Sequence, residues 1–183
     1  MYVKVYYKSI IMKKLPVILI LTLSIFLSSC KKDVITSNYD KSYTAWLDFK
    51  SSSHNSYTYT ANSGSVFGGY YVETKFTVKD GTITMREFQS GNYKPNTNDL
   101  IITKTWTENS SSLNTHGNEG HELLTLDQIY NKAKTVWLKA DPKQNDVYFE
   151  SKNNNLISLA GFVPKGCQDD CFNGINIKNI SVL

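Results

Sequence analysis

Groups that can bind a metal ion are concentrated in one short segment, which reads His116-Gly-Asn-Glu119-Gly-His121-Glu122. Imidazole nitrogens and carboxylate oxygens are ordinary zinc ligands. The spacing differs from the His-Glu-x-x-His pattern, in which both histidines share one helical face, and the two glycines favour a loop. We interpret the segment mainly as a solvated loop whose acids favour the N-terminus of the following helix. A metal site at His116, Glu119, His121 and Glu122 is the alternative.

Other catalytic patterns are missing from the sequence. The chain has three histidines and no Gly-x-Ser-x-Gly elbow, so a nucleophile activated by a nearby base is not indicated. Gly64, Gly68 and Gly69 lack the lysine pattern of a nucleotide-binding loop. We therefore expect neither enzyme activity nor a cofactor.

Two cysteines, Cys167 and Cys171, lie close together near the C-terminus. In an exported protein such a pair predicts a disulfide, here closing a short loop between two strands. The alternatives are a redox pair, or a metal site completed by Asp169 and Asp170. Redox motifs usually place two residues between the cysteines rather than the three found here.

Aromatic side chains make up 13% of the chain and gather on segments expected to be strands. Rings exposed on a sheet can stack on sugars or form the centre of a protein interface. More often such rings fill the core or form cross-strand pairs. The candidates for a binding surface are Tyr57, Tyr59, Tyr70, Tyr71, Tyr93 and Trp106.

The N-terminal segment predicts export. Lys13 and Lys14 follow Met12, the expected true start, and precede an apolar run from Leu15 to Leu27. The run has 13 residues, whereas a membrane-spanning helix needs about 20. It ends in Leu27-Ser28-Ser29-Cys30, so residues 1–29 are expected to be a cleavable signal.

This arrangement resembles the bacterial lipoproteins, and the resemblance covers the first thirty residues. It implies that Cys30 carries a diacylglyceryl group and a further acyl chain such as palmitate, which together give stable membrane anchoring. The residue after the cysteine is Lys31 rather than aspartate. By the analogy with enteric bacteria, this favours the outer membrane of the cell envelope.

Composition limits the partners of the remaining chain. The formal charge of +4 comes from four lysines of the leader, and 16 basic and 16 acidic residues remain without them. An electroneutral domain does not have the basic footprint of a nucleic-acid-binding protein. We expect no nucleic-acid partner.

Two helices and seven strands are predicted. A first helix over residues 40–50 would bury a stripe of Tyr39, Tyr43, Trp46 and Leu47. A second would begin at the N-cap Thr125, with Gln128 completing a capping box, and would run to Lys139. Its expected apolar face consists of Leu126, Ile129, Tyr130, Ala133, Val136 and Trp137.

Strands are expected at 56–60, 70–79, 82–88 and 100–107, and again at 146–150, 156–163 and 175–182. Asp80-Gly81 predicts a two-residue hairpin turn. The fold class that follows is α+β, a mainly antiparallel sheet with two helices packed on one face, in the order α-β-β-β-β-α-β-β-β. We expect a lipidated cysteine and short tether over 30–38 and a single domain over 39–183.

The mature chain also resembles a family of uncharacterised small exported bacterial domains. The matching pieces are Trp46 before Ser56-Tyr57-Thr58-Tyr59, the segment Thr77-Val78-Lys79-Asp80-Gly81-Thr82-Ile83, the helix from Leu126, and Asp146-Val147-Tyr148-Phe149. The chain lacks the paired cysteines often found in that family after the tyrosine-rich strand. The resemblance implies no particular activity.

These observations predict an envelope lipoprotein that is held to the membrane at Cys30 and binds a protein or glycan partner without catalysis. The second hypothesis is a metal-binding protein or metal-dependent enzyme that uses the loop from His116 to Glu122. A purely structural envelope component is the third.

Overall fold

The structure is a computed structural model that describes residues 34–65, 69–94, 97 and 99–183. The predicted signal, Cys30 and most of the expected tether lie outside these residues. The chain divides into two compact units, Met1–Ser37 and Asn38–Leu183. No helix among the described residues is long and apolar enough to cross a membrane.

The N-terminal helix covers residues 34–52, so it begins within the segment expected to be a tether. It ends where His54 and Asn55 adopt positive φ. Its buried stripe consists of Tyr39, Ser42 and Trp46, at helical spacing. The prediction was wrong for Leu47 and Tyr43, which are exposed on the side of the helix.

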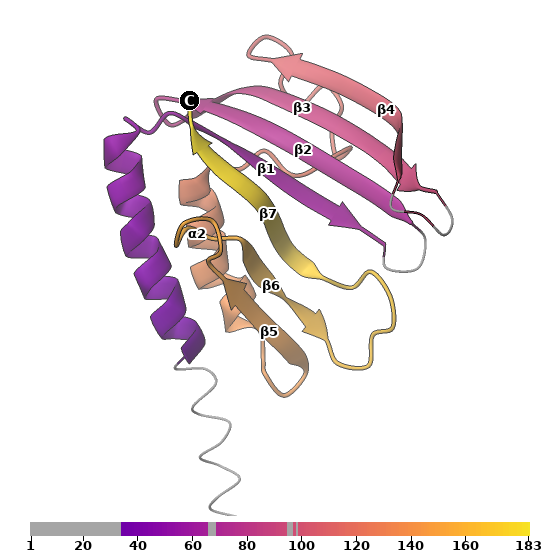
Figure 1. The fold of residues 1–183 in the computed structure, drawn as a ribbon. Coiled ribbons are helices and arrows are strands. Elements are labelled where there is room, and N and C mark those ends of the chain that lie inside the picture. The colour runs from indigo at the N-terminus through magenta and orange to yellow at the C-terminus, as the bar shows by residue number, and fades with distance from the viewer. Residues whose placement is uncertain (1–33, 66–68, 95–96, 98) are drawn as a thin grey trace, which may run out of the picture. The chain divides into compact units, whose positions relative to one another are not determined.

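Seven strands form one sheet in which every neighbouring pair is antiparallel (Figure 1). The first and last strands of the chain pair with each other, giving the order β4-β3-β2-β1-β7-β6-β5. The strands are β1 (Tyr57–Gly64), β2 (Tyr70–Lys79), β3 (Thr82–Tyr93), β4 (Leu100–Asn109), β5 (Asn145–Glu150), β6 (Leu159–Pro164) and β7 (Asn173–Val182).

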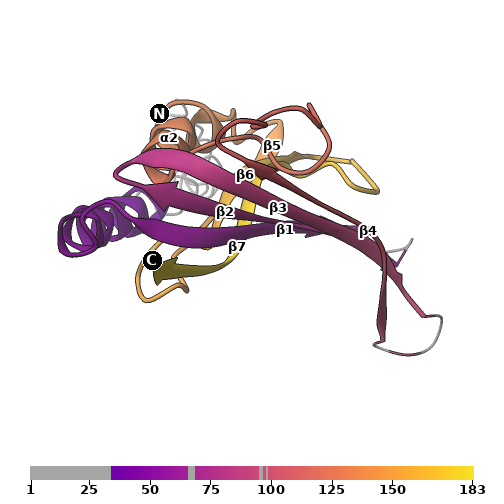
Figure 2. The ribbon, with the colours of Figure 1, turned by 90° about the horizontal axis from the view of Figure 1, so that it is seen from above.

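The core lies between one face of this sheet and the helices. Trp46 packs edge-on against Tyr57 with ring centroids 5.3 Å apart, and Tyr59 stacks on Phe76 at 4.7 Å. The Tyr57 hydroxyl accepts a hydrogen bond from the Leu126 backbone N–H at 2.8 Å. Figure 2 shows α2 (Leu126–Thr135) on this side of the sheet. The predicted α+β class, with a mainly antiparallel sheet, is confirmed.

Helix α2 begins as predicted, with Thr125 and Gln128 forming a complete capping box. The expected end at Lys139 was wrong, because α2 stops at Thr135 and a short 3-10 turn, η1 (Trp137–Lys139), follows. Val136 between them is exposed, whereas Trp137 is buried. The predicted apolar face is therefore confirmed for Trp137 and was wrong for Val136, because a continuous helical pattern does not reveal that the α-helix stops at Thr135.

The predicted Asp80-Gly81 hairpin connects β2 and β3, and both residues have positive φ, 46° and 77°. The Gly81 N–H donates to the Asn55 carbonyl at 2.9 Å, which ties the turn to the end of the N-terminal helix. A Cβ on Gly81 would lie 2.4 Å from the Asn55 side-chain nitrogen. Glycine is therefore favoured here by its positive φ, and any other side chain would also have to displace the Asn55 amide.

Candidate functional site

Two of the predicted binding aromatics belong to the interior, and a third is half-buried. Tyr57 and Tyr59 are fully buried on β1 and face the helices. Trp106 on β4 stacks on Phe88, at 4.8 Å, and on the His116 ring, at 4.2 Å, and is half-buried. The assignment to a binding surface was therefore wrong for Tyr57 and Tyr59, whereas for Trp106 it stays a prediction.

The other three, Tyr70, Tyr71 and Tyr93, lie where β2 begins and β3 ends. Tyr93 is 41% exposed, and its ring centroid is 6.0 Å from that of the half-buried Tyr71 in an edge-on arrangement. Tyr70 is also exposed, but alternation along β2 places it on the opposite face from Tyr71. Only Tyr71 and Tyr93 therefore share a surface.

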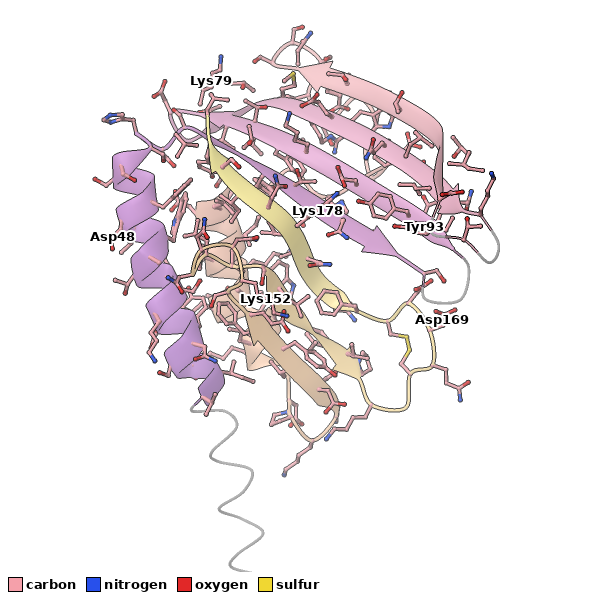
Figure 3. All side chains as sticks on the ribbon, viewed as in Figure 1. Asp48, Lys79, Tyr93, Lys152, Asp169 and Lys178 are labelled. Atoms are coloured by element: carbon pink, nitrogen blue, oxygen red, sulfur yellow. A yellow bond between two sulfur atoms is a disulfide. The ribbon has the colours of Figure 1, made fainter. Side chains whose placement is uncertain are left out.

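That surface is the face of the sheet that the helices leave uncovered, which we call the open face. Along β2, Val72, Thr74 and Phe76 point toward the core and are buried. Because strand side chains alternate, Tyr71 and Glu73 project to the other side. Figure 3 shows Tyr93 and Lys178 over the same side of the sheet.

Glu73 connects the polar groups of the open face. Its carboxylate accepts hydrogen bonds from the Tyr71 hydroxyl, from Lys178 Nζ at 2.9 Å and from Gln89 Nε2 at 3.3 Å. Partial burial raises the pKa of Glu73, but the bonds from Tyr71 and Lys178 outweigh it and leave the pKa below its ordinary value. Burial and the adjacent carboxylate raise the pKa of Tyr71 to about 12.

A shallow groove of about 290 Å³ continues from Glu73 across β3 to β4. Lys75 and Glu87 form an ion pair of 3.1 Å along it, and Thr105 and Thr107 line its far side. Each charge named on this part of the open face has a partner of opposite sign. The surface therefore offers hydrogen-bonding groups without a strong net charge.

The predicted metal-binding loop is folded differently from a metal site. His116 stacks on Trp106, whereas His121 Nδ1 lies 3.1 Å from the Thr74 hydroxyl. Glu119 pairs with Lys104, and Glu122 pairs with Lys132. No group of three metal-ligating side chains is found within the described part of the chain. The four candidates thus make their contacts with other side chains, among them Trp106, Lys104, Thr74 and Lys132.

The loop is instead organised by a buried ion pair that the sequence analysis missed. Arg86 on β3 and Glu108 on β4 are 1% and 0% exposed, and two parallel bonds of 2.9 Å join them. The Arg86 guanidinium also lies 4.7 Å from the centre of the Trp106 ring. Arg86 is the only arginine of the chain, and this is the one signal in the sequence that could have drawn attention to it.

Glu108 also holds the loop directly. Its carboxylate accepts the backbone N–H groups of Asn114 and His116, both at 2.8 Å. Burial raises the pKa of Glu108, but the Arg86 guanidinium and these N–H groups outweigh it and lower the pKa to about 2. The carboxylate stays ionised and satisfied in the interior, as a buried charge must be.

Cys167 and Cys171 form the predicted disulfide, with Cα atoms 6.3 Å apart. The disulfide closes the loop between β6 and β7, which is far in sequence from both Glu73 and Glu108. Both cysteines are bonded to each other, so neither the redox nor the metal alternative receives support from their surroundings.

The fold and the open face together define a two-layer α+β domain with one polar, partly aromatic sheet face left uncovered. Comparison of the chain with protein-family models, with curated proteins and with solved structures finds no match. The two resemblances noted in the sequence therefore remain expectations.

Proposed function

We propose that this chain is an exported, lipid-anchored protein of the cell envelope whose open face binds a glycan without catalysis. The observation that carries the proposal is the cluster of Tyr71, Tyr93, Glu73 and Lys178 on an uncovered sheet face. A polyhydroxylated ligand needs apolar ring faces for its C–H groups and fixed donors and acceptors for its hydroxyls. The cluster supplies both within a few residues.

Electrostatics supports a neutral ligand. Glu73 is paired with Lys178, and Lys75 with Glu87, so an approaching polyanion or polycation meets no unbalanced patch there. The centre of a protein–protein interface usually consists of contiguous apolar side chains. Here the aromatic pair borders directly on charged and hydroxylated side chains, which favours the glycan reading over the protein one.

The protonation state of Glu73 supports binding without hydrolysis. Glycosidases need one carboxyl group with a raised pKa that protonates the leaving oxygen. The pKa of Glu73 is instead lowered by its partners, so the carboxylate stays an acceptor. An ionised acceptor with fixed geometry suits recognition of sugar hydroxyls.

Anchoring through Cys30 is part of the same proposal and rests on the leader sequence. We expect mass spectrometry of the chain isolated from membranes to show a cleaved leader and an acylated Cys30. The variant Cys30→Ser should retain its leader and carry no acyl chain. An unmodified Cys30 in the membrane-bound chain would contradict the anchor while leaving glycan binding open.

Glycan binding is tested with the full chain purified from membranes in mild detergent and applied to an array of neutral glycans. We expect binding by the wild type and a loss of about tenfold or more in affinity for Tyr71→Ala, because a ring at the centre of a contact carries much of the energy. The matched control is Tyr70→Ala, which removes the same side chain one residue away on the opposite face.

Two further variants separate recognition from folding. Tyr71→Phe keeps the ring and removes the hydroxyl bonded to Glu73, and Glu73→Gln keeps the shape and removes the charge. Both should weaken binding with unchanged circular dichroism. Equal binding by Tyr70→Ala and Tyr71→Ala, or absence of binding to every neutral glycan, would refute the proposal.

A further inference from the structure

A second pair of exposed aromatic rings lies on the open face, near the edge of the sheet formed by β6 and β5. Tyr148 on β5 is 41% exposed, and Phe172, just before β7, is 38% exposed. Neither ring was singled out from the sequence. Neither is needed to fill the core, which on these strands consists of Phe149, Ala160, Ile175 and Ile177.

Two glycines lie beneath the Phe172 ring, where other residues would place side chains. Gly161 on β6 and Gly174 on β7 are directly paired in the register. A Cβ on Gly161 would lie 2.5 Å from the Phe172 Cζ, and a Cβ on Gly174 would lie 2.7 Å from the same atom. The phenyl ring therefore occupies the space that two side chains would otherwise take, and it covers the sheet at this point.

Tyr148 extends the same surface. It is the register partner of Gly161, so its side chain projects to the side on which Phe172 lies. Phe149, the next residue, is buried against the N-terminal helix through Tyr39, at 5.6 Å between ring centroids. Alternation then assigns Tyr148 to the open face.

The first cluster has a similar construction. Tyr71 is paired across the sheet with Gly64 on one side and Gly91 on the other, so no side chain flanks its ring in that row. Each half of the open face thus carries a tyrosine in a row of glycines, together with a second exposed ring. Between the halves, Lys178 projects from β7 and reaches Glu73 on β2.

We propose that the open face is a single extended site that binds a linear, neutral polysaccharide across the strands, with one aromatic cluster at each end. This inference rests on the proposed glycan-binding function and adds the class of ligand. β2 and β6 are separated by β1 and β7. At about 4.8 Å between adjacent strands, the clusters are about 15 Å apart, which is more than one sugar ring can span.

The polar strip between the clusters argues for a chain rather than a protein partner. Lys178 and Glu73 neutralise each other, and Asn176 and Asn179 are exposed beside them on β7. Two apolar platforms separated by amide and charged groups match a repeating polymer whose ring faces and hydroxyls recur along its length. A folded protein would gain little from desolvating this strip.

The test measures affinity against chain length. The full chain in mild detergent is titrated with fluorescent ladders, from disaccharide to octasaccharide, of α-1,4-glucan, β-1,4-glucan, β-1,4-xylan and α-1,6-mannan. We expect affinity to rise by about tenfold or more between the short and the long members of the bound series, as a second contact on one ligand adds effective concentration. Short members should bind through the Tyr71 cluster alone.

Variants assign the gain to the second cluster. Tyr148→Ala with Phe172→Ala should remove the gain with chain length and leave the affinity for short members unchanged. Phe172→Leu keeps an apolar side chain over the two glycines and removes the ring, so it should also reduce the gain in affinity with chain length. This variant replaces the double variant if the latter is unstable. Tyr70→Ala serves as the control for an exposed tyrosine on the opposite face.

The outcomes distinguish the two proposals. Binding that depends on Tyr71 but neither increases with chain length nor changes in the Tyr148 and Phe172 variants would overturn the extended site and leave the proposed function standing. Failure of every ladder to bind, with binding to the array of neutral glycans retained, would overturn the extended site alone, and failure of both the ladders and the array would overturn both proposals.

Discussion

Replacing Arg86 with methionine tests the most consequential interaction of the interior. The new side chain is apolar and unbranched and keeps most of the volume, but it is shorter and lacks the guanidinium. Glu108 would then be a fully buried carboxylate that retains only the hydrogen bonds from the loop, chiefly the N–H groups of Asn114 and His116. The cation–π contact with Trp106 would be lost as well.

The expected cost follows from the burial of both partners. Removing one member of a buried ion pair typically destabilises a protein by about 3 to 5 kcal/mol. A domain of ordinary stability has about 5 to 15 kcal/mol in total, so Arg86→Met should remove a large share of it. With a urea m-value of about 2 kcal/mol per molar, the midpoint should fall by about 2 M.

The double variant Arg86→Met with Glu108→Met makes the prediction specific. A simple buried ion pair is often replaced by apolar residues without loss. Here Glu108 also accepts two loop N–H groups, and each hydrogen bond to a charged group contributes about 1.5 to 3 kcal/mol. We therefore expect the double variant to stay at least about 2 kcal/mol below the wild type.

The assay is urea unfolding followed by tryptophan fluorescence, with Lys152→Met as the control. Lys152 forms an exposed ion pair with Glu150, so its loss should change stability by less than about 1 kcal/mol. A double variant as stable as the wild type would refute the reasoning, because it would show that Glu108 does not hold the loop.

Three further outcomes are expected in the same unfolding assay. Gly81→Ala should cost about 1 to 2 kcal/mol, because alanine is strained at a φ of 77° and its Cβ would displace Asn55; no loss would refute the role given to this turn. Burial lowers the pKa of His121 below 6.5, so its neutral form contributes stability that is complete above pH 6.5 and declines as the pH falls through the folded value. Glu108, whose pKa is lowered from 4.5 to about 2, contributes stability that is complete above pH 4.5 and is lost toward pH 2; an unfolding midpoint independent of pH between 7 and 2 would contradict both. Replacing Cys167 and Cys171 with serine should cost about 2 kcal/mol or less, because the disulfide closes a very short loop, and a larger loss would show that the loop supports more of the fold.

Local signals made much of the fold predictable. The capping box at Thr125 and the Asp80-Gly81 turn depend on residues next to each other in sequence, and both are present as predicted. The sequence did not predict which residues lie at the edges of the buried stripe of the N-terminal helix. Ser42 is buried because its hydroxyl lies 2.8 Å from that of Tyr130, a contact across 88 residues, whereas the apolar Leu47 faces solvent.

The site illustrates the same limit. Alternation in β2 and β3 indicates that Tyr71, Glu73 and Gln89 share a face, but not whether a helix covers it. Lys178 reaches Glu73 from a strand 105 residues away, because the last strand of the chain inserts beside the first. That pairing decides which groups meet on the open face, and no local pattern specifies it.

We expect the helix side of the sheet to contribute mainly to stability and the open face mainly to ligand binding. On the helix side, Arg86 and Glu108 fix the loop through contacts that are fully buried, so changes there should lower the unfolding midpoint. On the open face, Tyr93 and Phe172 are exposed and lie over sheet that is already paired, so their removal should alter binding and leave the midpoint nearly unchanged. The histidines near Glu108 belong to the first group, since His116 packs on Trp106 and His121 contacts Thr74. Both histidines lie in the loop that Arg86 and Glu108 hold, through the Glu108 bond to the His116 N–H and the Arg86 bond to the His121 carbonyl. Ligand binding is expected on the opposite face of the sheet, where the sequence shows no such clustering.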